Sequence, residues 1–255
     1  MKKWLIFISI ICMLPIESSA ETIQYVGSST VGKFITDASK VYTASRFTLN
    51  TVPESSGGEQ CAARERCSLG GVARDVQPKF LDMGVQATLI GKDAIAVIVH
   101  RDNPVKNLSL LQLKAIFTGK LTNWKEVGGP DITIKAVIVK KGSATRKVFR
   151  KVTLGQDDYK GTKVVTPDAK IVSTVALEKG TIGQISMAFI KVNKKIRPLF
   201  VDDQEPSVDN TDYPITRPLY LVTRGSPKGE VKAFIDWTLS PAGQAVVKKR
   251  FVGIN

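Results

Sequence analysis

Three times along this chain, a short apolar run ends in a turn of Ser, Thr and Gly and is followed by a stretch with helical spacing. The turns are Ser28-Ser29-Thr30, Ser55-Ser56-Gly57-Gly58 and Gly142-Ser143-Ala144-Thr145. Strands that alternate with helices in this way are typical of an α/β fold with a mainly parallel sheet. We therefore expect an α/β protein in which both halves of the chain carry this strand-turn-helix unit.

Hydrophobic periodicity predicts the remaining strands and helices, including two strands that connect the two halves of the chain. Strands are expected at residues 22–26, 48–52, 69–73, 134–139 and 184–188, and helices at 31–44, up to 66, 109–117, 146–152, 169–179, 228–239 and 241–249. The strongly apolar strands 93–99 and 218–223 are expected to cross between two lobes and form a hinge. This predicts a first lobe of residues 21–97 and 219–255 and a second lobe of residues 98–218, each with a sheet flanked by helices.

The first twenty residues have the three-part layout of a secretory signal peptide. Lys2 and Lys3 precede an apolar run at residues 4–14, Pro15 ends that run, and Ser18-Ser19-Ala20 supplies small residues before a cleavage point. The alternative is a membrane anchor, but the run is shorter than the ~20 residues that span a bilayer. We expect a signal peptide at residues 1–20, cleavage after Ala20, a periplasmic location and no stable membrane insertion.

The charge of the chain restricts its partners. The formal net charge is +14, and Lys2, Lys3 and Glu17 together account for +1, so residues 21–255 carry +13. This positive net charge favours anionic partners. The alternative is that it reflects only a basic, solvated surface. The basic residues are scattered and form no aromatic and basic stripe like that of RNA-binding sheets. No nucleic acid partner is therefore expected.

Removal of the signal peptide leaves two cysteines, Cys61 and Cys67. An exported protein with two cysteines favours one disulfide bond. In one continuous helix their Cα atoms would lie about 9 Å apart, beyond the ~7 Å that a disulfide tolerates, so the helix has to end before Cys67. The sequence Ser68-Leu69-Gly70-Gly71 supplies that break. A metal site is not expected, because His100 is the only histidine and no CxxC motif is present.

The three turns are candidates for binding a small anion. The start of a helix leaves backbone N–H groups unpaired and carries a partial positive charge, and hydroxyl groups add further donors. In open α/β sheets, ligands lie beyond the carboxyl ends of the strands, where these turns are expected. The alternative for each turn is that Ser and Thr only cap the helix. Arg74 and Arg146 could each contact an oxyanion with a planar guanidinium, or form a surface ion pair instead.

At these residues the chain resembles the phosphate-binding proteins of bacterial ABC transporters, the PstS-like group of periplasmic binding proteins. The resemblance lies in segments 27–31, 55–58, 73–74 and 142–146 and, outside the turns, in 110–129, 213–220 and 239–244. The stretch from Leu110 to Gly129 is the most specific of them. The resemblance covers nearly all of residues 21–255.

The resemblance implies two lobes that close on a dehydrated phosphate ion, with the permease of an ABC transporter as the partner. We expect a monomer without a cofactor. Carried over by motif and position, the candidate ligand-binding residues are Ser28, Ser29, Thr30, Ser55, Ser56, Arg74, Ser143, Ala144, Thr145 and Arg146.

Three departures from the family pattern concern the identity of the ligand. Many members have an arginine at the position of Val139, and many have a glycine where this chain has Ala144. Some place an aspartate at the end of the third strand, where it accepts a proton from phosphate. Here Arg74 stands at that place and Asp75 follows it. Asp75 is a candidate proton acceptor, with an exposed turn residue as the alternative.

These features predict an exported solute-binding protein that captures phosphate or a similar tetrahedral oxyanion for delivery to a permease. The alternative is a signalling or adhesion module that keeps the fold and uses its basic surface. An enzyme that acts on phosphate esters is not expected, because no serine has an evident base beside it and His100 is the only histidine.

Overall fold

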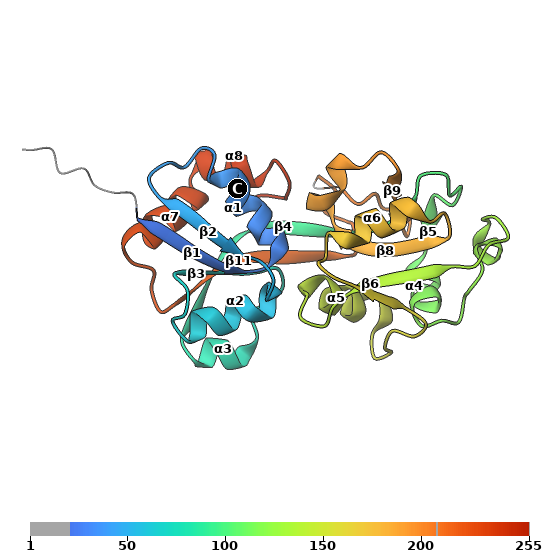
Figure 1. The fold of residues 1–255 in the computed structure, drawn as a ribbon, viewed down its shortest axis with the longest axis horizontal. Coiled ribbons are helices and arrows are strands. Elements are labelled where there is room, and N and C mark those ends of the chain that lie inside the picture. The colour runs from blue at the N-terminus through green and yellow to red at the C-terminus, as the bar shows by residue number, and fades with distance from the viewer. Residues whose placement is uncertain (1–20, 208, 255) are drawn as a thin grey trace, which may run out of the picture.

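Two groups of helices and strands lie side by side in the computed structural model and are joined by two long strands (Figure 1). The structure describes residues 21–207 and 209–254. The signal peptide expected at residues 1–20 lies outside the described residues. Within the described part of the chain, no helix combines the length and the apolar composition needed to cross a bilayer.

Strands and helices alternate along the chain, which confirms the predicted α/β class. The strands are β1 (Thr22–Gly27), β2 (Arg46–Asn50), β3 (Leu69–Val72), β4 (Val85–His100), β5 (Asn107–Leu108), β6 (Lys135–Val139), β7 (Lys163–Val165), β8 (Thr181–Ser186), β9 (Ile196–Pro198), β10 (Phe200–Val201) and β11 (Thr216–Arg224). The α-helices are α1 (Ser29–Ala38), α2 (Glu54–Ala63), α3 (Pro78–Asp82), α4 (Leu110–Phe117), α5 (Ala144–Phe149), α6 (Lys170–Leu177), α7 (Gly229–Leu239) and α8 (Pro241–Val247). Short 3₁₀ segments cover η1 (Trp124–Val127) and η3 (Met187–Val192), and a π-helical turn covers η2 (Arg150–Leu154).

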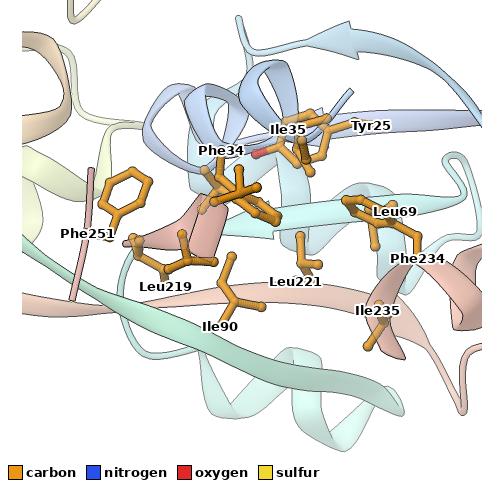
Figure 2. Packing of buried hydrophobic residues seen from close by; sticks show 14 of the residues in the cluster. Tyr25, Phe34, Ile35, Leu69, Ile90, Leu219, Leu221, Phe234, Ile235 and Phe251 are labelled. Carbon is orange, nitrogen blue, oxygen red and sulfur yellow. The ribbon is translucent and has the colours of Figure 1, made fainter. Parts of the chain in front are cut away.

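In the first lobe, β2, β1 and β3 form a parallel sheet, and β11 pairs antiparallel with β3. Helices α1, α7 and α8 cover one face, where Phe34 and Phe234 pack over Leu221 (Figure 2). Helices α2 and α3 cover the other face around Phe80. Because β1 and β2 are parallel, the first and second turns, which follow them, lie at the same edge of the sheet.

In the second lobe, β7, β6 and β8 are parallel, and β4 runs antiparallel to β8. One face packs on α4 and α5 through Phe117 and Phe149. The other face packs on α6 through Ile171 and Val175. The third turn follows β6 and opens α5, which lies near α2 of the first lobe (Figure 1).

Strands β4 and β11 pass through both lobes and pair antiparallel with each other. In the first lobe β11 also pairs with β3, and in the second lobe β4 also pairs with β8. Along β4 the packing changes from the first core at Ile90 to the second core at Ala94. The residue before β11, Ile215, packs in the second core, and Leu219 on β11 packs in the first. We propose lobe limits at residues 97–98 and 218–219, which fall on these two crossing strands.

Several predicted element limits are wrong. The helix predicted at 31–44 ends at Ala38, because the chain turns back there and packs Tyr42 on the aromatic ring of Phe234. The strand predicted at 184–188 begins at Thr181, because Gly183 lies inside the sheet between β6 and β4. The crossing strand predicted at 93–99 begins at Val85, because its first half pairs with β11.

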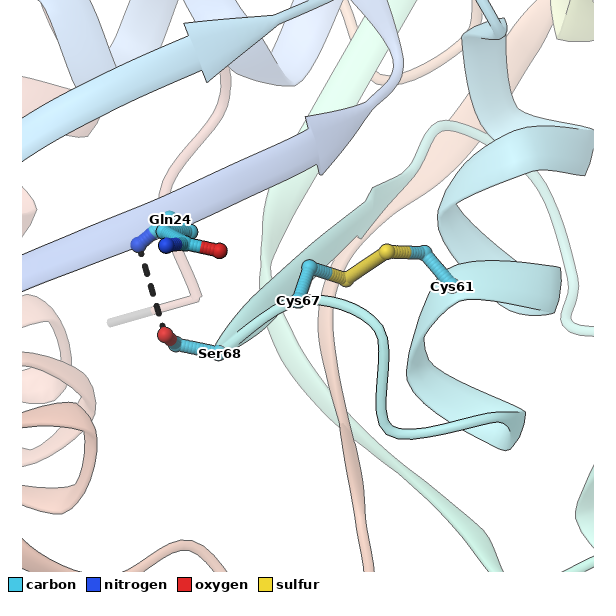
Figure 3. The surroundings of a disulfide bond; sticks show 4 residues. All are labelled: Gln24, Cys61, Cys67 and Ser68. Carbon is cyan, nitrogen blue, oxygen red and sulfur yellow. Dashed lines mark hydrogen bonds between the residues drawn. A yellow bond between two sulfur atoms is a disulfide. The ribbon is translucent and has the colours of Figure 1, made fainter.

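Cys61 and Cys67 form the predicted disulfide bond, with their Cα atoms 5.6 Å apart (Figure 3). Helix α2 ends at Ala63, and the chain reverses at Glu65, whose φ of 53° is left-handed. The early end of the helix brings the two cysteines within bonding range, as the length argument requires. The bond ties α2, which carries the second turn, to the segment that enters β3.

Candidate functional site

One guanidinium group connects the first and third turns. Nη2 of Arg217 donates a hydrogen bond to Oγ1 of Thr30 (2.9 Å), and Nη1 donates to Oγ1 of Thr145 (3.0 Å). All three residues are buried, although Thr30 lies on α1 of the first lobe and Thr145 on α5 of the second. Because each threonine hydroxyl accepts from the arginine, its own hydrogen is left to donate to a ligand.

Asp93 holds Arg217 in place. Nε of Arg217 donates to Oδ2 of Asp93 (2.9 Å), and the hydroxyl of Ser186 donates to Oδ1 (2.8 Å). Burial raises the pKa of the Asp93 carboxyl, and the charge of Arg217 opposes that rise. The two charged residues lie on the crossing strands β11 and β4, so the ion pair belongs to the predicted hinge.

The first turn opens α1. Oγ of Ser28 accepts hydrogen bonds from the N–H groups of Thr30 and Val31 and so caps the helix. The N–H of Ser29 donates to the carboxylate of Glu54 (3.1 Å), and the buried hydroxyl of Ser29 lies near the same carboxyl and lowers its pKa. The carboxylate of Glu54 therefore accepts from a backbone N–H at the start of α1, which is the kind of donor that an anionic ligand would use.

The second turn contacts the other two. Glu54, which opens α2, is 3% exposed and has a left-handed φ of 58°, uncommon for a residue other than glycine. Oγ of Ser55 accepts from the N–H of Ala73 (3.1 Å) and holds α2 at the end of β3. The hydroxyl of Ser56 lies 3.4 Å from the carbonyl oxygen of Gly142, to which it donates. The structure thus brings all three turns together.

The third turn is held by a second buried carboxylate. Oγ of Ser143 accepts from the N–H of Thr145 (3.2 Å) and donates to Oδ2 of Asp168. Oδ1 of Asp168 is buried and has no hydrogen-bond partner among the described residues. Ala144 is buried too and packs with the core of the first lobe. We call the group formed by Ser29, Thr30, Ser56, Ser143, Thr145 and Arg217 the cradle.

Arg74 lies beneath the second turn, and protein groups hold its guanidinium. Nη1 and Nη2 donate to the two oxygens of the buried Glu59 carboxylate (2.6 and 2.7 Å), which also accepts from Gln77. Nη2 of Arg74 reaches within 3.5 Å of Oγ of Ser56. The structure therefore makes Arg74 a support of the second turn, and its predicted contact with a ligand remains a proposal.

Arg146 is tied to the second lobe. Its guanidinium lies over the ring of Tyr159, 5.0 Å from the centroid, and Nη1 donates to the carbonyl oxygen of Val139 (3.3 Å). The hydroxyl of Tyr159 donates back to the carbonyl oxygen of Arg146 (3.0 Å). Arg146 thus braces the end of β6, from which the third turn starts, and direct contact with a ligand remains a proposal.

Glu54 and Asp168 give the cradle an excess of negative charge. Arg217 is paired with Asp93 and Arg74 with Glu59, whereas neither Glu54 nor Asp168 forms a salt bridge with any described residue. Burial raises the pKa of Glu54 to about 7, and the charge of Asp168 adds to that rise. Burial also raises the pKa of Asp168. Because the two carboxylates repel each other, the closed lobes favour at least one proton on the pair.

Unlike these two carboxylates, the side chain of Asp75 forms no hydrogen bond or salt bridge with a described residue of the three turns. Its side chain is exposed. Burial raises the pKa of Tyr220, and the charge of Asp75 adds to that rise. This position agrees with the alternative that treats Asp75 as an exposed turn residue. The carboxylates that do reach the turns are Glu54 and Asp168.

Four residues of this site are not among those expected from the amino-acid sequence: Arg217, Asp93, Glu54 and Asp168. The sequence offers a clue to two of them, Asp93 and Arg217, which lie in or beside the apolar crossing strands. A charged residue is rarely buried there without a partner, so the two are candidates for a buried ion pair. Glu54 adjoins the second turn, but its side chain could equally have pointed to solvent. Asp168 had no such signal, because its contact with Ser143 spans 25 residues.

Two lobes thus enclose a buried polar site at their hinge, and comparison with known proteins agrees with this architecture. A family model described as a PBP superfamily domain matches residues 15–242. The chain belongs to the PBP superfamily. This is a superfamily of binding proteins and not of enzymes.

Within the PBP superfamily, the chain is similar to phosphate-binding proteins. The phosphate-binding protein PstS of Bacillus subtilis (strain 168) is 32% identical over 167 residues, which are 62% of this chain and 55% of that protein. The protein of the same name from Borreliella burgdorferi is 27% identical over 199 residues, 72% of this chain and 71% of that protein. The chain therefore aligns with little more than half the length of the Bacillus protein.

Solved structures in the PBP superfamily confirm the fold. A putative phosphate ABC transporter substrate-binding protein from Clostridium perfringens, solved with bound phosphate, has a TM-score of 0.85 and 30% identity, and the match covers 92% of this chain and all of that one. An ABC-type phosphate transport receptor from Vibrio cholerae has a TM-score of 0.72 and 23% identity, covering 89% and 98% of the two chains. The resemblance to PstS-like proteins is thus confirmed as distant homology.

Proposed function

We propose that this protein captures inorganic phosphate, or a similar tetrahedral oxyanion, between its lobes and delivers it to the permease of an ABC transporter. One observation carries the proposal: the hydroxyls of Thr30 and Thr145, from different lobes, lie 2.9 and 3.0 Å from the same guanidinium. Such a group of donors is complete only when the lobes are closed, so binding and closure are coupled. The similarity to the Clostridium protein supports phosphate as the ligand, and export to the periplasm belongs to the same proposal.

The contacts divide into donors and supports. The proposed donors are the hydroxyls of Ser29, Thr30 and Thr145, whereas the N–H of Ser29 donates to Glu54 and the hydroxyl of Ser56 donates to Gly142. Ser28 and Ser143 cap α1 and α5 and fix the two turns, and Ser55 fixes α2 against β3. Arg74, Ala144 and Arg146 shape the surroundings of these donors.

Glu54 and Asp168 are the proposed source of selectivity. A carboxylate beside the cradle accepts a hydrogen bond from an oxyanion that keeps a proton, as phosphate does, and repels one that has none, as sulfate does. Glu54→Gln should therefore raise the affinity for sulfate relative to phosphate. The exposed Asp75→Asn is the matched control and should leave that ratio unchanged.

Isothermal titration of residues 21–255 with phosphate, arsenate, molybdate and sulfate tests the proposal. We expect phosphate binding, and we expect Ser29→Ala combined with Thr145→Val to abolish it without unfolding the protein. Thr122→Val, on the exposed surface of the second lobe, should bind phosphate like the wild type. Undiminished affinity in the double variant would place the ligand elsewhere.

A signalling or adhesion module is the second candidate, and one contact favours it: Glu54 already occupies the N–H of Ser29 in the closed site. Thermal melting separates the two functions. A ligand present at 100 times its dissociation constant stabilises the folded protein by roughly 2.7 kcal/mol. A folded protein whose melting temperature responds to none of the four oxyanions would favour the module.

A further inference from the structure

Basic residues are concentrated beside the third turn. The segment 140–151 contains no acidic residue and carries +6 of the +13 net charge of residues 21–255. It runs from the end of β6 through the third turn and α5 into η2. The basic residues are Lys140, Lys141, Arg146, Lys147, Arg150 and Lys151. Nearly half of the excess positive charge therefore lies next to the proposed oxyanion site.

Part of this segment surrounds an open pocket of about 500 Å³ on the second lobe. Its lining consists of Lys141, Arg146, Lys147, Arg150 and one carboxylate, Asp158. Asp158 lies 3.4 Å from Nε of Arg150 and so offsets that charge. Lys141 and Lys147 are both exposed. The pocket therefore presents a positive charge to the solvent.

Two other lysines contact the opposite lobe. Nζ of Lys140, in the second lobe, donates to the carbonyl oxygen of Val52 in the first. The ammonium of Lys33, on α1 of the first lobe, lies over the ring of Phe189 in the second, 5.1 Å from the centroid. Both ammonium groups thus lie at the boundary between the lobes, where the cleft opens when the lobes separate.

Lys147 on α5 faces cations of the first lobe. Partial desolvation lowers the pKa of its ammonium, and the charges of Arg74 and Lys79 lower it further, whereas Glu59 opposes them. Arg74 is paired with Glu59, so Lys79 is the cation that stays uncompensated. Lys79 is exposed on α3, which lies beside α2 on the side of the first lobe that α5 approaches (Figure 1). Like charges from the two lobes therefore face each other across the boundary.

We call Lys33, Lys79, Lys140, Lys141 and Lys147 the rim lysines. None of them forms a salt bridge with a carboxylate in the described part of the chain. Elsewhere several lysines do form such pairs: Lys40, Lys114, Lys125, Lys135, Lys179 and Lys232. Because unpaired charges of one sign along a cleft add up to a potential that attracts counter-ions, the boundary between the lobes is positive toward solvent.

The interior of the site has the opposite charge. Glu54 and Asp168 lie beside the cradle, and neither has a salt bridge to a described residue. Their negative charge repels an oxyanion that approaches. A positive rim offsets this repulsion during the approach and leaves the interior carboxylates free to select among the anions that arrive.

We infer that the rim lysines steer small oxyanions into the open cleft and set the rate of capture, without contacting the ion that is bound in the cradle. The inference rests on the proposed function, whose ligand it shares, and it gives a kinetic role to five residues outside the proposed donors. Charged clefts raise association rate constants by about 10- to 1,000-fold, and salt suppresses the effect.

Stopped-flow mixing with inorganic phosphate tests the inference. Residues 21–255 carry a fluorophore on Ala169→Cys, because Ala169 is exposed and lines a pocket together with Ser29 of the other lobe. Cys61 and Cys67 are joined to each other and do not take the label. The label therefore reports closure of the lobes in the same way in every variant.

The rim variant combines Lys79→Gln, Lys141→Gln and Lys147→Gln. At about 10 mM salt, where charges act over ~30 Å, its association rate constant should be at least about fivefold below that of the wild type. At about 1 M salt, where the range is ~3 Å, the difference should disappear. The dissociation rate constant should stay within about twofold at both salt concentrations, because the lysines do not contact the bound ion.

Two further triple variants serve as controls. Arginine at the same three positions keeps the charge and should keep the wild-type association rate. Lys106→Gln, Lys195→Gln and Lys228→Gln remove an equal charge at exposed positions beside β5, β9 and α7, away from the boundary between the lobes (Figure 1). This distant variant should lower the association rate by less than about twofold.

The outcomes distinguish the steering from the proposed function. Phosphate binding with an association rate that the rim variant leaves unchanged, or that the distant variant lowers equally, overturns the steering and leaves the proposed function standing. Faster dissociation with an unchanged association rate has the same consequence, because it makes the lysines contacts of the bound ion. Failure of phosphate to bind the folded wild type overturns both.

Discussion

The guanidinium of Arg217 lies 2.8 Å from the carboxylate of Asp93, and both side chains are buried where the two crossing strands pair. The same guanidinium reaches Thr30 in one lobe and Thr145 in the other. The ion pair on the crossing strands therefore also contacts the proposed ligand site. A change in the relative position of the lobes should change the distances between Arg217 and the two threonines.

Arg217→Met should destabilise the protein by about 3–5 kcal/mol, because it leaves the buried Asp93 carboxylate without its cation. Urea denaturation measures the loss, and isothermal titration should show no phosphate binding. Combining Arg217→Met with Asp93→Leu should recover part of the stability but none of the binding. Arg224→Met, which removes a partly exposed pair with Glu65, should change stability by less than about 1 kcal/mol. Equal instability of the single and double variants would contradict this account of the ion pair.

The stability of the protein should fall as the pH rises from 4.5 to about 7. The pKa of Glu54 is raised from its ordinary 4.5 to about 7, so the folded state keeps a proton that the unfolded chain has already lost. This difference corresponds to about 3 kcal/mol, fully lost above the folded pKa. Chemical denaturation of wild type and Glu54→Gln at pH 4.5 and pH 8 measures it. A difference between the two proteins that is the same at both pH values would show that Glu54 does not titrate in this range.

Removal of the disulfide bond by Cys61→Ala and Cys67→Ala should lower the free energy of unfolding by about 2 kcal/mol, because the two cysteines are only 6 positions apart in the sequence and the bond restricts the unfolded chain modestly. The midpoint of urea denaturation reports the change. A reducing agent should lower the midpoint of the wild type by a similar amount and leave the variant unchanged. Sensitivity of the variant to the reducing agent would rule out this bond as the cause.

Gly58→Ala should lower stability by about 1–3 kcal/mol and weaken phosphate binding. A Cβ atom at this position would lie 2.6 Å from the carbonyl oxygen of Gly71 and 3.1 Å from Cα of Gly27, so α2 has to move away from β1 and β3. That movement displaces Ser55 and Ser56, which precede Gly58 on the helix. Gly142→Ala has its nearest contact at 3.8 Å and is the stability control. Thermal melting and titration of both variants provide the check, and equal tolerance would argue against tight packing at residue 58.

Short-range sequence patterns predict much of the fold. The alternation of apolar runs with Ser, Thr and Gly turns predicts the α/β class, since strands and helices each follow a period set by their own backbone geometry. The spacing of Cys61 and Cys67 predicts both the disulfide bond and the end of α2 that it requires. The caps at Ser28 and Ser143 follow from the same short-range chemistry, because each serine bonds to N–H groups two or three residues away.

The partners of the buried charges depend instead on how distant segments pack. Arg217 meets Asp93 across 124 residues and Thr30 across 187, and Asp168 meets Ser143 across 25. No periodicity encodes such contacts, because each arises when separate strands and helices fill a common core and enclose the polar groups between them. For that reason the amino-acid order points to the three turns, whereas the partners of Arg217, Glu54 and Asp168 are decided only when the two lobes pack together.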